Sequence, residues 1–177
     1  MDSATLEYKR LILMQIASVQ IPELASNPEH MEYVARVVAA IAHADQVDKL
    51  GAPYIDHVTE VAQAVRSNVP EAVTVALLHD ALDDCPALNA GLLSCMGFND
   101  VVLKALELLR RPEGMSVRQS LQKILDAPAG EDSTRFAIAV KCHDLEHNQR
   151  LPASPTQKDI DRSEFYKKQL RWFREQI

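Results

Sequence analysis

Residues 71–84 read EAVTVALLHDALDD, and the prediction of the fold starts from this stretch. Pro70 precedes it, as is typical of the first turn of a helix, where the missing proline N–H would have no partner anyway. Six of the seven residues in 72–78 are apolar, so we expect a buried helix at the centre of the molecule. This helix, predicted over 71–84, ends in four polar residues: His79, Asp80, Asp83 and Asp84.

Helical patterns flank this segment on both sides. Apolar residues recur at intervals of three and four, and no convincing strand pattern appears. Ser26 or Asn27 before Pro28 marks one helix start, the 116–119 segment forms a capping box, and Asp132 or Ser133 marks another start. The other predicted helices cover 6–16, 55–65, 88–96, 100–111 and 159–176, with a loop at 20–27 that contains Pro22. We therefore predict an all-α bundle of about eight helices around the central apolar one.

Length and charge limit the function classes. The 177 residues fit one domain covering 1–177, and a net charge of −6 gives no general attraction for nucleic acid or anionic lipid. The apolar runs fall short of the roughly 20 residues that span a bilayer, and the first ten residues lack a secretory signal. Three cysteines form no CxxC pair. We expect a cytoplasmic protein with reduced cysteines and with neither nucleic acid nor membrane as partner.

The polar end of the central helix suggests a bound cation. Three carboxylates within five positions repel one another and resist desolvation, although a solvated acidic helix end would also explain them. Two other segments favour the cation, because His57 lies at the head of one helix and Asp144 lies within another apolar helix. A divalent metal held by His57, His79, Asp80 and Asp144 would have two imidazole and two carboxylate ligands. This donor set favours Mn²⁺, Fe²⁺, Mg²⁺ or Zn²⁺.

The order of these ligands resembles the H…HD…D signature of the HD-domain phosphohydrolases, which are all-helical, metal-dependent enzymes. Residues 42–57, AHADQVDKLGAPYIDH, resemble the AHxGQxRKxGxPYIxH segment of the RelA/SpoT-type alarmone hydrolases. Residues 77–84, LLHDALDD, are similar to their LLHDxxED, and residues 141–148, KCHDLEHN, to their KLADRLHN. The resemblance covers roughly residues 30–150 and implies an HD-domain helical bundle like the small stand-alone alarmone hydrolases.

The resemblance also implies an activity. Family members hydrolyse the 3′-diphosphate of (p)ppGpp to GDP or GTP and pyrophosphate, usually with Mn²⁺, so the expected partner is a small nucleotide or phosphoester. Asp83 and Asp84 occupy the Glu-Asp positions of the family, where a carboxylate orients the nucleophile or moves a proton. Lys49, Lys141 and Asn148 are predicted to bind phosphate or ribose oxygens of the substrate.

Three departures from the family pattern concern the substrate. Asp48 stands where the family has an arginine that helps to hold the guanine nucleotide, and a carboxylate there repels phosphate. Asp83 replaces the family glutamate, and His143, Leu145 and Glu146 replace other residues of the third motif. The resemblance as a whole predicts ppGpp as the substrate, whereas these departures keep the hydrolytic site intact but favour the alternative of another nucleotide, such as NADPH, or a phosphorylated metabolite.

Two alternatives from other classes stay open. A degenerate HD domain could bind metal or nucleotide and only sense it, although unneeded buried acids destabilise a core. Residues 143–147, HDLEH, also fit the HxxEH motif of inverted zinc peptidases, but only 30 residues follow His147 to supply a third ligand. On the last helix, Trp172 and Phe173 either pack on the core or form a partner surface.

Overall fold

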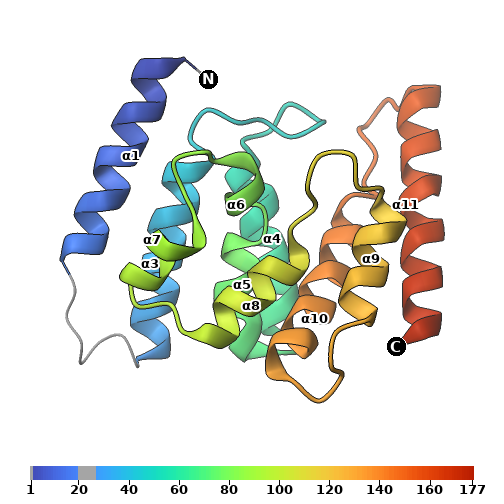
Figure 1. Ribbon diagram of the computed structural model, residues 1–177. Coiled ribbons are helices and arrows are strands. Elements are labelled where there is room, and N and C mark those ends of the chain that lie inside the picture. The colour runs from blue at the N-terminus through green and yellow to red at the C-terminus, as the bar shows by residue number, and fades with distance from the viewer. Residues whose placement is uncertain (1, 20–26) are drawn as a thin grey trace.

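The computed structural model describes residues 2–19 and 27–177, and this part of the chain folds as an all-α bundle (Figure 1). The helices are α1 (Ser3–Ser18), α3 (Pro28–Ala42), α4 (Tyr54–Arg66), α5 (Val73–Leu78), α6 (Ala81–Asp84), α7 (Ala90–Cys95), α8 (Asp100–Leu109), α9 (Val117–Leu125), α10 (Asp132–His147) and α11 (Gln157–Gln176), with a 3₁₀ turn η1 (Pro70–Ala72) before α5. The all-α prediction is confirmed. Residues 20–26 of the loop predicted over 20–27, including Pro22 and the candidate cap Ser26, lie outside the described residues.

The helix starts follow local capping chemistry. Asn27 accepts hydrogen bonds from the backbone N–H groups of Glu29 and His30, and Pro28 occupies the first helical turn. The capping box predicted from Ser116 is present, and Thr156 with Asp159 forms a second one. The predicted start of α10 was wrong by one or two residues, because Glu131 is the N-cap and makes no side-chain cap bond.

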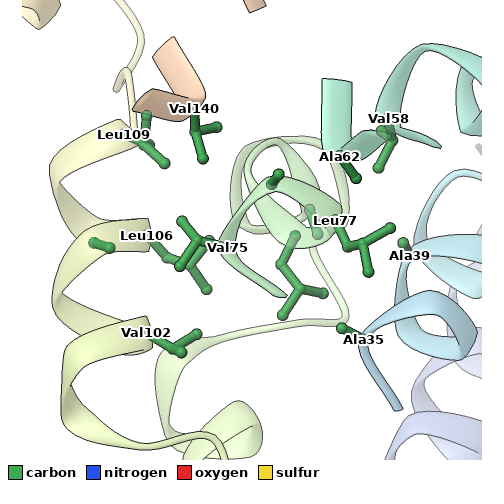
Figure 2. Close-up of a cluster of buried hydrophobic side chains, with 14 of the residues drawn as sticks. Ala35, Ala39, Val58, Ala62, Val75, Leu77, Val102, Leu106, Leu109 and Val140 are labelled. Atoms are coloured by element: carbon green, nitrogen blue, oxygen red, sulfur yellow. The ribbon is translucent and has the colours of Figure 1, made fainter. Parts of the chain in front are cut away.

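Helix α5 lies at the centre of the core, as predicted. Figure 2 shows Val75 and Leu77 of α5 between the apolar faces of α3, α4 and α8. The labelled neighbours are Ala35, Ala39, Val58, Ala62, Val102, Leu106, Leu109 and Val140. All of them are buried, so a polar substitution of Val75 or Leu77 would meet apolar side chains.

The predicted single helix over 71–84 was wrong. The chain forms η1, then α5, and then breaks at His79 and Asp80 before α6. On an unbroken helix adjacent side chains would point about 100° apart. Here the break lets His79 Nε2 and Asp80 Oδ2 approach to 3.0 Å, so both side chains face the same point.

The last helix packs on the bundle. Phe173 is fully buried, and the Arg118 guanidinium lies 3.7 Å from the ring centroid of Trp172, which is partly buried. These contacts support the packing alternative for both aromatic residues. Across residues 2–19 and 27–177, no helix combines the length and apolar character needed to cross a membrane. The three cysteines all lie in this part of the chain and are unpaired.

Candidate metal centre

Four donor atoms converge from three parts of the fold. His57 comes from the first turn of α4, Asp144 from α10, and His79 and Asp80 from the break between α5 and α6. His57 Nε2 lies 3.7 Å from Asp80 Oδ2 and 3.5 Å from Asp144 Oδ1. His79 Nε2 lies 3.0 Å from Asp80 Oδ2 and 3.9 Å from Asp144 Oδ1. The structure thus brings all four predicted ligands together.

These separations fit a metal ion. Donor atoms around an ion at about 2.1 Å lie roughly 3.0 Å apart as octahedral neighbours and roughly 3.4 Å apart in a tetrahedron. The donor atoms of His57, His79 and Asp144 all lie within 4.8 Å of one another. These three side chains are buried, whereas the Asp80 side chain keeps 26% exposure. The group could therefore hold a metal ion that is reached from the Asp80 side.

Hydrogen bonding shows which ring nitrogen of His79 carries the lone pair that faces the candidate metal centre. His79 Nδ1 lies 2.8 Å from the carbonyl oxygen of Ala76. A carbonyl can only accept, so Nδ1 carries the proton and neutral His79 has a lone pair on Nε2. That Nε2 atom is buried, has no hydrogen-bond partner among the residues that the structure describes, and faces the carboxylates of Asp80 and Asp144. A lone pair opposite two carboxylates needs a cation or a hydrogen-bond donor between them, and a metal ion or a proton on Nε2 would each serve.

The charges of the group agree with this requirement. Burial alone would lower the pKa of His79, but Asp80 and Asp144 outweigh it and raise that pKa to about 9. Burial alone would raise the pKa of both carboxyls, but His79 beside Asp80 and Lys141 beside Asp144 hold it below its usual value. In metal-stripped protein a proton on His79 therefore takes the place of the cation.

Because a proton on His79 takes the place of the metal ion, we expect the stability of the metal-stripped protein to depend on pH. The pKa of His79 is about 9 in the folded protein against 6.5 for the free side chain, so its stabilising proton is fully present below pH 6.5. We expect the free energy of unfolding to fall by about 3 kcal/mol as the pH rises from 6.5 through 9. Urea denaturation in the presence of a chelator measures this, with His79→Gln as the control that lacks the slope. A flat profile for the wild-type chain would contradict the prediction.

Neighbouring side chains hold the two carboxylates. Tyr54 donates its hydroxyl to Asp80 Oδ2 at 2.6 Å, and burial together with Asp80 raises the pKa of Tyr54, so the hydroxyl keeps its proton. Asn148 donates to Asp144 Oδ1 at 2.6 Å, and Lys141 donates to Asp144 Oδ2 at 2.8 Å. Lys141 and Asn148, predicted to bind substrate, thus lie at the site but contact a ligand carboxylate.

The two acids after the ligands have different surroundings. Asp84 Oδ2 accepts a hydrogen bond from Gln46 Nε2 at 2.8 Å, and Gln46 Oε1 accepts one from His43 Nδ1 at 2.7 Å. Burial raises the pKa of Asp84. Asp83 instead accepts from Arg110 Nε at 3.3 Å and from the backbone N–H of Arg111 at 2.8 Å. The structure therefore ties Asp83 to the end of α8, whereas Asp84 is a carboxylate suited to carrying a proton.

A cavity of about 70 Å³ adjoins the metal group. Its walls comprise Asp48, Lys49, Leu50, Tyr54, His57, His147, Asn148, Arg150 and Arg162. Three cations and one carboxylate line it, although the protein as a whole is acidic. The carboxylate of Asp48 accepts from the backbone N–H groups of Leu50 and Ala52 at 2.8 and 2.9 Å, so it also stabilises the loop. Lys49 lies 3.3 Å from the hydroxyl of Tyr166.

Sequence reasoning missed two neighbours of the ligands, Tyr54 and His147. Each lies three residues from a ligand, Tyr54 before His57 and His147 after Asp144, so helical spacing was the available signal. The zinc-peptidase alternative gains no support from the arrangement. His143 contacts Asn68 and Glu146, whereas His147 faces His57.

Comparison with models of known protein families and with curated proteins finds no match to this chain. The functional interpretation therefore depends on the residues and their geometry. What the geometry supports directly is a buried group of His57, His79 and Asp144 that could hold a metal ion. Asp80 Oδ2 lies 3.0 Å from His79 Nε2, and the cationic cavity adjoins His57.

Proposed function

We propose that the chain is a metal-dependent phosphohydrolase of the HD type, with His57, His79, Asp80 and Asp144 as ligands of a divalent cation. One observation carries the proposal: the buried His79 Nε2 faces two carboxylates and has no hydrogen-bond partner. A metal-dependent hydrolytic site needs such a cation and access for the substrate; the Asp80 side chain keeps 26% exposure, and the cavity reaches the group at His57. The ligand set suits Mn²⁺ as the first candidate and Fe²⁺, Zn²⁺ or Mg²⁺ as alternatives.

The proposed reaction is the release of pyrophosphate from the 3′-diphosphate of (p)ppGpp. The resemblance of the three motifs supports this substrate, and Lys49, Arg150 and Arg162 line the cavity with positive charge for a phosphate group. A second candidate is a different nucleotide or a small phosphoester. Asp48 favours this second candidate. It stands where the family has an arginine, and its carboxylate accepts hydrogen bonds from the backbone of its own loop instead of offering a positive charge to the nucleotide. The cavity is also smaller than the roughly 300 Å³ at which pockets usually enclose a whole small molecule.

The residues of this chain have distinct tasks in the proposed reaction. A bound divalent ion would supply a Lewis acid that polarises a phosphoryl oxygen and lowers the pKa of water. Asp84, held by Gln46, accepts the proton of the attacking water, and burial, which raises its pKa, makes it a stronger base for this transfer than an exposed aspartate. Lys141 and Asn148 fix the orientation of Asp144. The cavity cations neutralise the phosphate charge while the P–O bond to the leaving group breaks.

A product assay tests the proposal. Metal-stripped protein supplied with Mn²⁺ is incubated separately with ppGpp, NADPH, GTP and a generic phosphodiester. We expect GDP and pyrophosphate from ppGpp, and a roughly 10²- to 10⁴-fold lower kcat for Asp84→Asn, which keeps every metal ligand. The matched neighbour Asp83→Asn should lose stability through its lost Arg110 and Arg111 contacts while kcat stays close to that of the wild type.

Other outcomes of this assay separate the alternatives. Cleavage of another compound without cleavage of ppGpp would keep the hydrolytic mechanism and change the substrate. Absence of cleavage with all four compounds, in protein that binds Mn²⁺, would overturn the enzyme proposal and favour a module that only senses its ligand. Equal kcat values for Asp84→Asn and the wild type would remove Asp84 from the proposed mechanism.

A further inference from the structure

His147 lies directly behind the candidate ligand His57. The two Nδ1 atoms are 2.9 Å apart, and the ring centroids are 4.4 Å apart at an interplanar angle of 73°. Both side chains are largely buried, with exposed fractions of 4% for His57 and 12% for His147. Two nitrogen atoms at this distance share one proton, so one ring donates and the other accepts.

The far side of His147 shows which ring donates. His147 Nε2 lies 3.3 Å from Glu60 Oε2, and Arg150 pairs with the same carboxylate. Within the described residues the two atoms are not aligned as a hydrogen bond, but the negative charge of the carboxylate repels a lone pair and therefore favours the tautomer of His147 that carries its proton on Nε2. His147 Nδ1 is then the acceptor, and His57 Nδ1 must donate. This leaves the lone pair of His57 on Nε2, which faces Asp80 and Asp144.

We infer that His147, supported by Glu60, is a positioning residue that sets the tautomer and ring orientation of His57 for metal binding. Histidine ligands of metals usually donate their second N–H to a carboxylate or a carbonyl. His79 has such an acceptor in the carbonyl oxygen of Ala76. For His57, the acceptor of the second N–H is the Nδ1 atom of His147. The inference depends on the metal site of the proposed function but not on the reaction or its substrate.

The matched pair His147→Leu and His147→Asn tests the inference. Both side chains have a similar size, but only asparagine keeps an acceptor near the position of Nδ1. The readout is the affinity for Mn²⁺ alone, measured by titration calorimetry on folded, metal-stripped protein. We expect His147→Leu to lower the affinity about 10- to 100-fold and His147→Asn to restore most of it. A purely structural role would change the melting temperature of both variants without this difference in affinity.

Glu60→Ala is a third variant that keeps the test decisive if His147→Leu does not fold. The Glu60 side chain is 42% exposed, so its removal leaves the core intact, and we expect a smaller loss of Mn²⁺ affinity in the same direction. Wild-type affinity in both His147→Leu and Glu60→Ala would overturn the inference. Wild-type protein that fails to bind Mn²⁺ would overturn the inference and the metal site together. Wild-type protein that binds Mn²⁺ without hydrolysing any phosphate ester would refute only the proposed reaction.

Discussion

We expect His79→Ala to lose metal binding and hydrolysis together. His79 supplies one of four donor atoms and lies only 3.0 Å from Asp80 Oδ2, so its removal leaves two carboxylates with one imidazole. Removal of a residue that merely orients a ligand lowers metal affinity or activity about 10- to 100-fold. Removal of the ligand itself should therefore lower the Mn²⁺ affinity by more than about 100-fold, and kcat/KM should fall by a comparable or larger factor.

Titration calorimetry with Mn²⁺ and the product assay measure the two effects on the same preparation. The matched control is His30→Ala, which removes a partly exposed histidine in the first turn of α3 and should leave both quantities unchanged. Circular dichroism verifies that His79→Ala stays helical. Retention of Mn²⁺ affinity within a few-fold of the wild type would show that His79 is not a metal ligand.

The largest stability change is expected for Lys141→Met in the metal-stripped protein. The Lys141 side chain is only 14% exposed, and Nζ donates to Asp144 Oδ2 at 2.8 Å. Burial alone would lower the pKa of Lys141, but Asp144 and Asp80 outweigh it, so the ammonium stays charged. Methionine keeps most of the apolar stem and leaves Asp144 without its cation. Removal of one partner from a buried ion pair destabilises a protein by about 3–5 kcal/mol.

Urea denaturation with and without Mn²⁺ measures this change. Bound Mn²⁺ should reduce the loss, because a divalent cation stabilises the Asp144 carboxylate that Lys141 no longer contacts. Lys104→Met is the matched control, since the Lys104 side chain is 65% exposed and the same substitution there should change stability by no more than about 0.5 kcal/mol. Equal effects of the two substitutions would mean that the Lys141–Asp144 pair contributes no more than a surface contact.

The sequence was sufficient for the features that depend on neighbours along the chain. Apolar residues at intervals of three and four define a buried helical face, so the all-α class and the central position of 73–78 could be predicted. Caps such as Asn27 and Ser116 act within one turn, so their positions were visible as well. The expectation that His57, His79, Asp80 and Asp144 lie close together came from their pattern in three separate segments.

Other features depended on how the helices pack. The apolar run of 72–78 and the acids of 80–84 predict one continuous helix, and neither glycine nor proline in 71–84 indicates the break at His79 and Asp80. Two acids that are adjacent in the sequence also contact different partners. Asp83 faces Arg110 and Asp84 faces Gln46, although the two carboxylates are chemically alike.

The division between sequence and tertiary structure at the candidate site has a physical reason. By itself, the sequence determined the all-α class, the position of most helices, and which segments carry histidine or carboxylate. Tertiary structure alone decided that His147 lies 2.9 Å behind His57, that Gln46 contacts Asp84, and that Arg110 contacts Asp83. Helical periodicity depends on a few neighbouring residues, whereas these contacts join side chains up to 90 positions apart and depend on the packing of whole helices.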